Sequence, residues 1–332
     1  MSDQPATTVE RIAHAASSPE GANSTYVLPD RGLVIDPGPP GEDAWQTLTA
    51  GLSASGLAVD AVETVVVTHW HADHSGLAPR LAETADAELV LHEADAPLVA
   101  AYSVERERRV DRDARRLREW GVPDPTVDEV SANDDPSPMP DRFPVRSVTG
   151  GDAIAGVEVV HTPGHTRGHL ALATSDALFL GDAVLPTYTP NVGGSDTRMD
   201  RALSTYLDTL DRLEARFQAA GTDRRSPVRT YPGHGATVDL CDRIAVTRSH
   251  HADRVRAVVR ALPDSEPGRT PWDVAERLFG QMTGIHAKMG AGEAAAHLAF
   301  AAAGGLTARV DDAPDRYVAT GADLSTPLAD RR

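Results

Sequence analysis

The sequence contains a single cysteine, a single lysine and no long apolar run among its 332 residues. The lone Cys241 excludes an internal disulfide and any metal site built from several thiolates. No segment approaches the ~18 consecutive apolar residues that a membrane-spanning helix needs. Residues 1–10 are polar and lack the basic and then apolar layout of a secretory signal. From these absences we expect a cytoplasmic protein with no membrane partner.

The scarcity of lysine leaves an acidic chain whose positive charges are almost all arginines. Lys288 is the only lysine among 32 basic residues, and the formal net charge is −17. A large negative charge opposes association at high salt, so a halophilic source is expected, although a GC-rich genome would favour arginine equally well. The charge also argues against a general affinity for nucleic acid, because phosphate binding needs a positive surface.

The composition, 41% hydrophobic and 24% charged, is that of an ordinary globular protein. The length suffices for a large α/β domain and a smaller one, which we place at residues 1–240 and 241–332. Residues 121–144 hold six prolines and many acids, and are predicted to form a solvated loop near the site. Strands are expected at 32–35, 62–68, 88–92, 157–161, 178–181 and 228–231, and helices at 45–56, 77–83, 104–120 and 201–219.

Beyond Gly235 the pattern becomes mainly helical. Predicted are helices at 242–262, from 271 onward and at 284–303, and a hairpin of 306–310 with 316–319. Thr270 is the expected N-cap of the second helix, with Pro271 in its first turn. Three helices and a small wing suggest a winged-helix-like domain. From Arg243 onward 12 basic residues accompany 11 acidic ones, so this domain is much less acidic than the rest and is expected to face something anionic.

Four metal-binding side chains lie within six residues at the end of an apolar run. His69, His71, Asp73 and His74 directly follow the β-branched segment 62–68, whose pattern is that of a buried strand. Alternation along an extended chain sends His69 and His71 to the same side. The chain then has to turn, which lets Asp73 and His74 reach a second position nearby. One pair of side chains could then bind one divalent metal, and the other pair could bind a second metal beside it.

Three further donors follow strands elsewhere in the chain. His165, Asp182 and His234 each come shortly after a predicted strand, and a glycine precedes each of them. Glycine allows the backbone to approach a site closely. Five histidines and two aspartates therefore gather at four predicted strand ends. The sequence predicts a metal centre at this edge.

The segments THWHADH, TPGHTRGH, FLGDAV and YPGHG resemble the metal motifs of the metallo-β-lactamase superfamily, in family order, over residues 10–240. The resemblance is greater to the glyoxalase II and endoribonuclease branches than to true β-lactamases. It implies an α/β fold, the four-layer αβ/βα sandwich. It also implies that one metal is held by His69, His71 and His165, that a second is held by Asp73, His74 and His234, and that Asp182 bridges the two.

Nitrogen and oxygen ligands without thiolates suit two zinc ions, and iron or manganese could use the same donors. Two such ions would hold a bridging hydroxide as the nucleophile, with Asp73 relaying a proton. His169 is a candidate for catalysis through hydrogen bonding beside the metals, with structural packing as the alternative. His92, His161 and Asp36 are expected to be structural. His250 and His251 are adjacent on a helix and are expected to lie at the surface.

Two hydrolytic functions and one non-enzymatic function compete on this sequence. The first is hydrolysis of a thioester, ester or lactone small molecule, as in glyoxalase II. The alternative is an RNA phosphodiesterase, since the segments around His250, Thr270 and His297 look like the C-terminal domain of the mitochondrial β-lactamase-like endoribonuclease. A binding module that has lost catalysis is disfavoured because all seven ligands are present. A dedicated β-lactamase is disfavoured because no export signal is recognisable.

Overall fold

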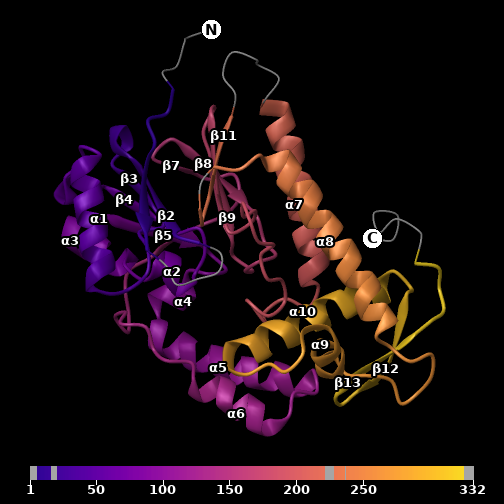
Figure 1. Ribbon diagram of the computed structural model, residues 1–332. Coiled ribbons are helices and arrows are strands. Elements are labelled where there is room, and N and C mark those ends of the chain that lie inside the picture. Colours follow the sequence, from indigo (N-terminus) through magenta and orange to yellow (C-terminus); the bar gives the residue numbers. More distant parts are fainter. Residues whose placement is uncertain (1–5, 16–20, 221–227, 236, 325–332) are drawn as a thin grey trace. The chain divides into compact units, whose positions relative to one another are not determined.

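The computed structural model describes residues 6–15, 21–220, 228–235 and 237–324 (Figure 1). The chain forms two compact units. The first comprises Met1–Arg106, Pro136–Pro190 and Thr209–Ile244, and the second Glu107–Asp135, Asn191–Asp208 and Ala245–Arg332. The second unit thus includes two segments from the middle of the chain as well as the C-terminal part. The domain boundary predicted at residues 240/241 stays a prediction.

The first unit is built on two mixed sheets. One has the strand order β1-β2-β3-β4-β5-β6, antiparallel from β1 to β3 and parallel from β3 to β6. The other has the order β11-β10-β9-β8-β7 and is antiparallel except for the β10–β11 pair. The strands of the first sheet are β1 Glu10–His14, β2 Asn23–Leu28, β3 Leu33–Ile35, β4 Thr64–Val66, β5 Glu88–His92 and β6 Arg146–Val148. Those of the second are β7 Ala153–Ile154, β8 Val157–His161, β9 Leu170–Ala173, β10 Ala177–Gly181 and β11 Arg229–Pro232.

Alternating residues of these strands fill the space between the two sheets. Tyr26 and Leu28 of β2 pack in one buried cluster with Phe179 of β10 and Tyr231 of β11. The ring centroids of Phe179 and Tyr231 lie 5.0 Å apart in a stacked arrangement. Because successive strand side chains point to opposite faces, the neighbouring Val27 is left to face away from the second sheet.

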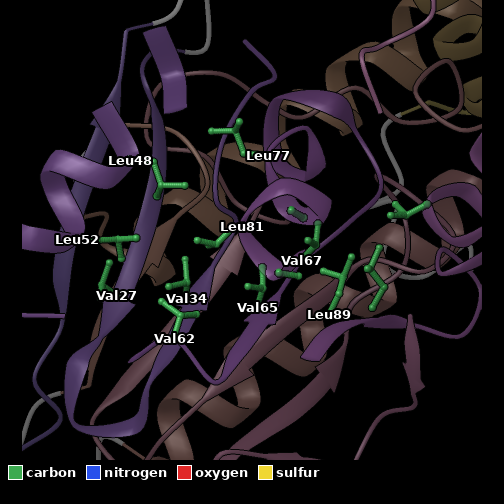
Figure 2. Close-up of a cluster of buried hydrophobic side chains, with 14 of the residues drawn as sticks. Val27, Val34, Leu48, Leu52, Val62, Val65, Val67, Leu77, Leu81 and Leu89 are labelled. Atoms are coloured by element: carbon green, nitrogen blue, oxygen red, sulfur yellow. The ribbon is translucent and has the colours of Figure 1, made fainter. Parts of the chain in front are cut away.

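Helices cover the outer faces of both sheets. Val27, Val34, Val65 and Leu89 of the first sheet pack against Leu48 of α1 (Glu42–Ala54), in a cluster that also includes α3 (Ala78–Ala85) (Figure 2). On the second sheet, Glu158 of β8 accepts a hydrogen bond from Arg216 of α7 (Ala202–Ala220) at 2.9 Å. The layers are therefore helix, sheet, sheet and helix. The predicted αβ/βα sandwich is confirmed.

The second unit contains a helix where a solvated loop is predicted at residues 121–144. After α5 (Tyr102–Glu119), residues Asp124–Ala132 form α6. Pro123 caps this helix and Pro125 lies in its first turn, where the missing N–H has no helical partner to lose. Val127 and Val130 of α6 are buried with Trp272 and with alanines of α10. The prolines mark a helix start here, so the loop prediction is wrong for these nine residues.

The C-terminal part of the second unit follows the predicted pattern closely. It contains α8 (Leu240–Arg260) from Ala245 onward, α9 (Pro271–Phe279), α10 (Gly284–Ala303) and the hairpin β12 (Thr307–Asp312) with β13 (Asp315–Ala319). Thr270 Oγ1 accepts a hydrogen bond from the Asp273 N–H at 3.0 Å, and the Asp273 carboxylate accepts one from the Thr270 N–H at 2.9 Å. This capping box confirms the predicted cap. None of the described helices is long and apolar enough to cross a membrane.

His251 is buried, which corrects the prediction that it lies at the surface. Its side chain is 2% exposed, and its Nδ1 lies 3.0 Å from Nε2 of His297 on α10. His297 donates from Nδ1 to the Glu293 carbonyl at 2.7 Å, so its Nε2 accepts from His251. His250 is half-buried, and its ring centroid lies 5.3 Å from that of His251. The partner of His251 is distant in sequence and could not be read from local spacing.

This pair makes the stability of the second unit dependent on pH. Burial lowers the pKa of His297 to about 3 and that of His251 well below its usual value. Above pH ~6.5 the folded and unfolded chains are both neutral at these groups. As the pH falls from ~6.5 towards 3, the unfolded chain binds protons that the folded chain does not, so folding becomes less favourable.

We expect His297→Gln to reduce this loss, because glutamine can keep both hydrogen bonds and does not titrate. Between pH 6.5 and 5 one such histidine costs about 2 kcal/mol of unfolding free energy. Chemical denaturation of both proteins at pH 7.5 and 5.0 measures the difference. The same pH dependence in the variant and in the unchanged protein would show that His297 does not carry the effect.

Candidate metal centre

The first ligand segment begins where β4 ends. β4 stops at Val66, two residues earlier than the predicted strand, and the chain then bends at residues 68–70, which brings it to His69 and His71. Residues Ala72–Ser75 form the single turn α2, which carries Asp73 and His74. A strand followed at once by a helical turn thus delivers four ligand-type side chains. His69 and His74 are fully buried, whereas the Asp73 side chain is 41% exposed.

The structure brings His69, His71 and His165 together into one group. His71 Nδ1 lies 3.0 Å from His69 Nε2 and 3.1 Å from His165 Nε2. His165 comes from the loop between β8 and β9, so the group joins the two sheets. Three ring nitrogens that face one another at this separation can bind one cation between them.

Asp73, His74 and His234 form a second group beside the first. His74 Nε2 lies 3.3 Å from His234 Nε2, and Asp73 Oδ2 lies 3.4 Å from His234 Nε2. His234 follows β11 on a turn between Gly233 and Gly235. This group combines one carboxylate with two imidazoles.

Asp182 lies between the two groups, at the end of β10. Its Oδ2 is 3.8 Å from His165 Nε2 and 3.4 Å from His234 Nε2, and its Oδ1 is 3.5 Å from His74 Nε2. Oδ1 is buried and accepts no hydrogen bond, although such atoms normally have a partner. The neighbouring Gly233 leaves the space for this carboxylate, because a Cβ there would lie 2.2 Å from Oδ1.

The charges within this cluster are strongly coupled. Burial acts to lower the pKa of His74, but the carboxylates of Asp182 and Asp73 outweigh it and raise that pKa well above its usual value. The same balance raises the pKa of His234 to about 10, with Asp182 as the main cause. Burial acts to raise the pKa of Asp182, but His74 and His234 hold it well below its usual range. The carboxylates therefore stabilise positive charge at this position.

Burial lowers the pKa of His69 well below its usual value, and the neighbouring His74 and His71 lower it further. His69 is thus a neutral imidazole with a lone pair available to a cation. Its Nδ1 donates to Thr68 Oγ1 at 3.1 Å, which leaves Nε2 facing the cluster. The donor set contains neutral imidazole, carboxylate and an unpartnered buried oxygen, and no thiolate. These residues fit one or two divalent cations.

Asp36 supports His74 and the backbone beside His69 through hydrogen bonds. It accepts hydrogen bonds from the Thr68 N–H and Oγ1–H, both at 2.7 Å, and from His74 Nδ1 at 3.0 Å. The bond to His74 places its proton on Nδ1 and turns Nε2 towards the cluster. Asp36 was predicted to be structural near the site. The structure shows that it supports both ligand groups.

His169 lies behind Asp182. Its Nε2 accepts a hydrogen bond from the Asp182 N–H at 3.0 Å, and its Nδ1 lies 2.7 Å from Thr162 Oγ1. Burial lowers its pKa well below the usual value, so the ring is neutral and Nε2 is occupied as an acceptor. The sequence left hydrogen bonding beside the metals and structural packing open for His169, and the bond to the Asp182 N–H is of the first kind.

One contributor was missed by sequence reasoning. Asn23 at the start of β2 donates from Nδ2 to Asp73 Oδ2 at 3.0 Å and to the Asp73 carbonyl at 3.1 Å. Its local signal is that of a strand residue, and an isolated β-bridge to His234, a residue more than 200 positions away, places it at the site. His92 and His161, predicted to be structural, stack on each other with ring centroids 4.0 Å apart. His161 donates to the Arg167 carbonyl at 3.1 Å.

A match to a protein family model shows which family the chain belongs to. Residues 18–217 match the family model described as the metallo-beta-lactamase superfamily. The chain belongs to the metallo-β-lactamase superfamily. It is 26% identical over 287 residues to the “Probable metallo-hydrolase YqjP” of Bacillus subtilis (strain 168), covering 82% of this chain and 86% of that protein.

The chain is also similar to two further proteins. It is 26% identical over 287 residues to an atrochrysone carboxyl ACP thioesterase of Aspergillus fumigatus, covering 78% of this chain and 72% of that one. The crystal structure of a metallo-beta-lactamase family protein from Thermus thermophilus superposes with a TM-score of 0.73 at 25% identity, covering 94% of this chain and 98% of that one. Membership of this superfamily and these hydrolytic relatives make the chain a metal-dependent hydrolase.

Proposed function

We propose that the chain is a dinuclear zinc hydrolase that cleaves a thioester, ester or lactone bond of a small molecule. The observation that carries the proposal is the pair of ligand groups with Asp182 within 3.8 Å of histidines from both, which brings seven nitrogen and oxygen donors close together. The similarity to a protein named as a thioesterase supports the acyl class of substrate. Iron or manganese would suit the same donors, so zinc is part of the proposal.

The residues divide into those that hold ions and those that orient them. His69, His71 and His165 would hold one ion, and Asp73, His74 and His234 the other, with Asp182 between them. Bound divalent ions lower the pKa of water and polarise the bond to be broken, so no serine or cysteine nucleophile is needed. Asp73 is the most exposed of the aspartates in the cluster, and we assign it a proton-relay role towards the substrate. Asn23 fixes its Oδ2, and His169 fixes the backbone of Asp182.

The alternative is cleavage of an RNA phosphodiester. It is favoured by the C-terminal region, where 12 basic residues slightly outnumber 11 acidic ones from Arg243 onward. The net charge of −17 opposes it, because a polyanion is repelled by an acidic protein. We therefore rank the acyl substrate first.

A side-by-side assay separates the two. The purified chain is incubated with acyl thioesters, an aryl ester and a lactone, and in parallel with single-stranded RNA, before and after treatment with a chelator. We expect hydrolysis of at least one acyl substrate, its loss with the chelator and its return with zinc, and about two zinc ions per chain by elemental analysis. Cleavage of RNA alone would refute the acyl proposal, and activity that persists without metal would refute the metal centre.

A further inference from the structure

Like Asp36, Asp95 is a buried carboxylate that is not one of the seven candidate ligands. It lies in the turn that follows β5. Asp95 is fully buried, and its N–H donates to the His92 carbonyl at 2.9 Å, which fixes the turn on the first sheet. Its two carboxylate oxygens accept from different residues of one loop. Oδ2 accepts from Thr166 Oγ1 at 2.7 Å and Oδ1 from the Gly168 N–H at 2.9 Å.

That loop carries His165. It runs between the end of β8 at His161 and the start of β9 at Leu170, in the second sheet. It is pressed against Asp95 closely enough that a Cβ at Gly168 would lie 2.5 Å from Asp95 Cγ. Thr166 follows His165 directly, so the Asp95–Thr166 bond fixes the backbone beside the imidazole that has to meet His71.

Two other hydrogen bonds hold the loop near its two ends. The Thr209 hydroxyl of α7 donates to the Pro163 carbonyl at 2.7 Å, and the Leu170 N–H donates to the Thr68 carbonyl at 2.8 Å. Asp95 acts between them, and it ties the loop to the first sheet, which also carries the segment of His69 and His71. His165 comes from the opposite sheet to those two ligands, so its position depends on how firmly the loop is joined to the first sheet.

We propose that Asp95 is a positioning residue for the metal position formed by His69, His71 and His165. It sets the affinity of that position by holding the His165 loop, and it does not contact the ion or the substrate. Hydrogen-bond partners that orient metal ligands typically change metal affinity 10–100-fold when removed. This inference rests on the proposed function, since it requires that the cluster binds metal.

The test measures each metal position alone. His234→Ala disables the second position and His165→Ala the first, and zinc affinity is measured in each background by competition with a chromophoric chelator. Adding Asp95→Ala is expected to weaken zinc binding about 10–100-fold in the His234→Ala background. It is expected to have less than about a twofold effect in the His165→Ala background, because the side chain that Asp95 positions is already absent.

Two further variants distinguish positioning from general stability. Asp95→Asn keeps an oxygen that can accept from Gly168 and an amide that can donate to Thr166, so it is expected to recover most of the affinity. Asp176 is the matched control. It is a carboxylate that is 8% exposed and accepts from the Thr7 N–H at 3.0 Å and from the Thr7 hydroxyl at 2.6 Å. Asp176→Ala should lower thermal stability without changing zinc affinity in either background.

The outcomes separate this inference from the proposed function. Failure of the unchanged chain to bind zinc overturns the proposed function and this inference with it. If the unchanged chain binds two ions, equal weakening of both positions by Asp95→Ala, or no weakening of either, overturns this inference alone. Should Asp95→Ala fail to fold, Thr166→Val removes only the hydroxyl contact, and an unchanged first position in that variant refutes the role of the loop anchor.

Discussion

Replacement of His165 by alanine is expected to lower turnover by about three orders of magnitude and to remove one of the two bound ions. His165 is the only ligand of the first group that comes from the second sheet, and its Nε2 lies 3.1 Å from His71 Nδ1. Without it the proposed first position keeps two imidazoles and the shared Asp182, one donor fewer than the full set, which weakens zinc binding there. Loss of the stabilisation that a catalytic ion gives amounts to several kcal/mol, and about 4 kcal/mol corresponds to a thousandfold.

The measurement is kcat/KM on the acyl substrate identified, together with zinc content after exhaustive dialysis. His161→Ala is the matched control, because it removes an imidazole four residues earlier that stacks on His92 and points its Nε2 at the Arg167 carbonyl. This control should keep two zinc ions and most of the activity. A His165→Ala protein with full zinc content and undiminished turnover would contradict the assignment of the metal centre.

The parts of the site that could be predicted are those that local chain direction determines. An apolar run ending in His69 and His71 predicts a strand that delivers two imidazoles to one side, and the turn after it predicts a second position for Asp73 and His74. In the structure β4 is followed by a bend at residues 68–70 and then by α2, and the imidazoles of His69 and His71 still meet. Glycines before His165, Asp182 and His234 likewise marked backbone that has to come close. Gly233 shows why, since any larger residue would displace Asp182.

The parts that could not be predicted depend on contacts between distant segments. Asn23 and Asp95 have no local signal for a role at the metal centre, because the residues that they contact are 50 and about 70 positions away in the chain. His251 was placed at the surface because it adjoins His250, whereas its partner His297 is 46 residues further on. The α6 error has a different cause. Pro123 and Pro125 suit both a loop and a helix start, and only the burial of Val127 and Val130 against α10 decides between them.

Lys288, the only lysine of the chain, also contacts a residue that is distant in sequence. Substitution of that residue, Asp113, is expected to have the largest effect on stability. Lys288 of α10 donates to Asp113 Oδ2 of α5 at 2.6 Å, and both side chains are almost fully buried. Asp113 also accepts from Thr197 Oγ1 at 2.6 Å, so it joins three segments of the second unit. Asp113→Ala would leave the ammonium group of Lys288 buried without its carboxylate. We expect it to lower the free energy of unfolding by about 3–5 kcal/mol.

The reverse substitution should cost less. In Lys288→Met the carboxylate keeps Thr197, and Arg109 Nη1 lies 3.5 Å from Asp113 Oδ2 and can compensate its charge. The double variant Asp113→Leu with Lys288→Met should recover much of the stability, because an apolar pair of similar size avoids the cost of burying charge. Chemical denaturation followed by tryptophan fluorescence measures all three, since Trp120 and Trp272 are buried in the same unit. Asp253→Ala, which breaks the exposed pair with Arg256 on α8, is the control and should cost less than about 1 kcal/mol. An Asp113→Ala protein as stable as this control would show that the buried pair contributes no more than a surface one.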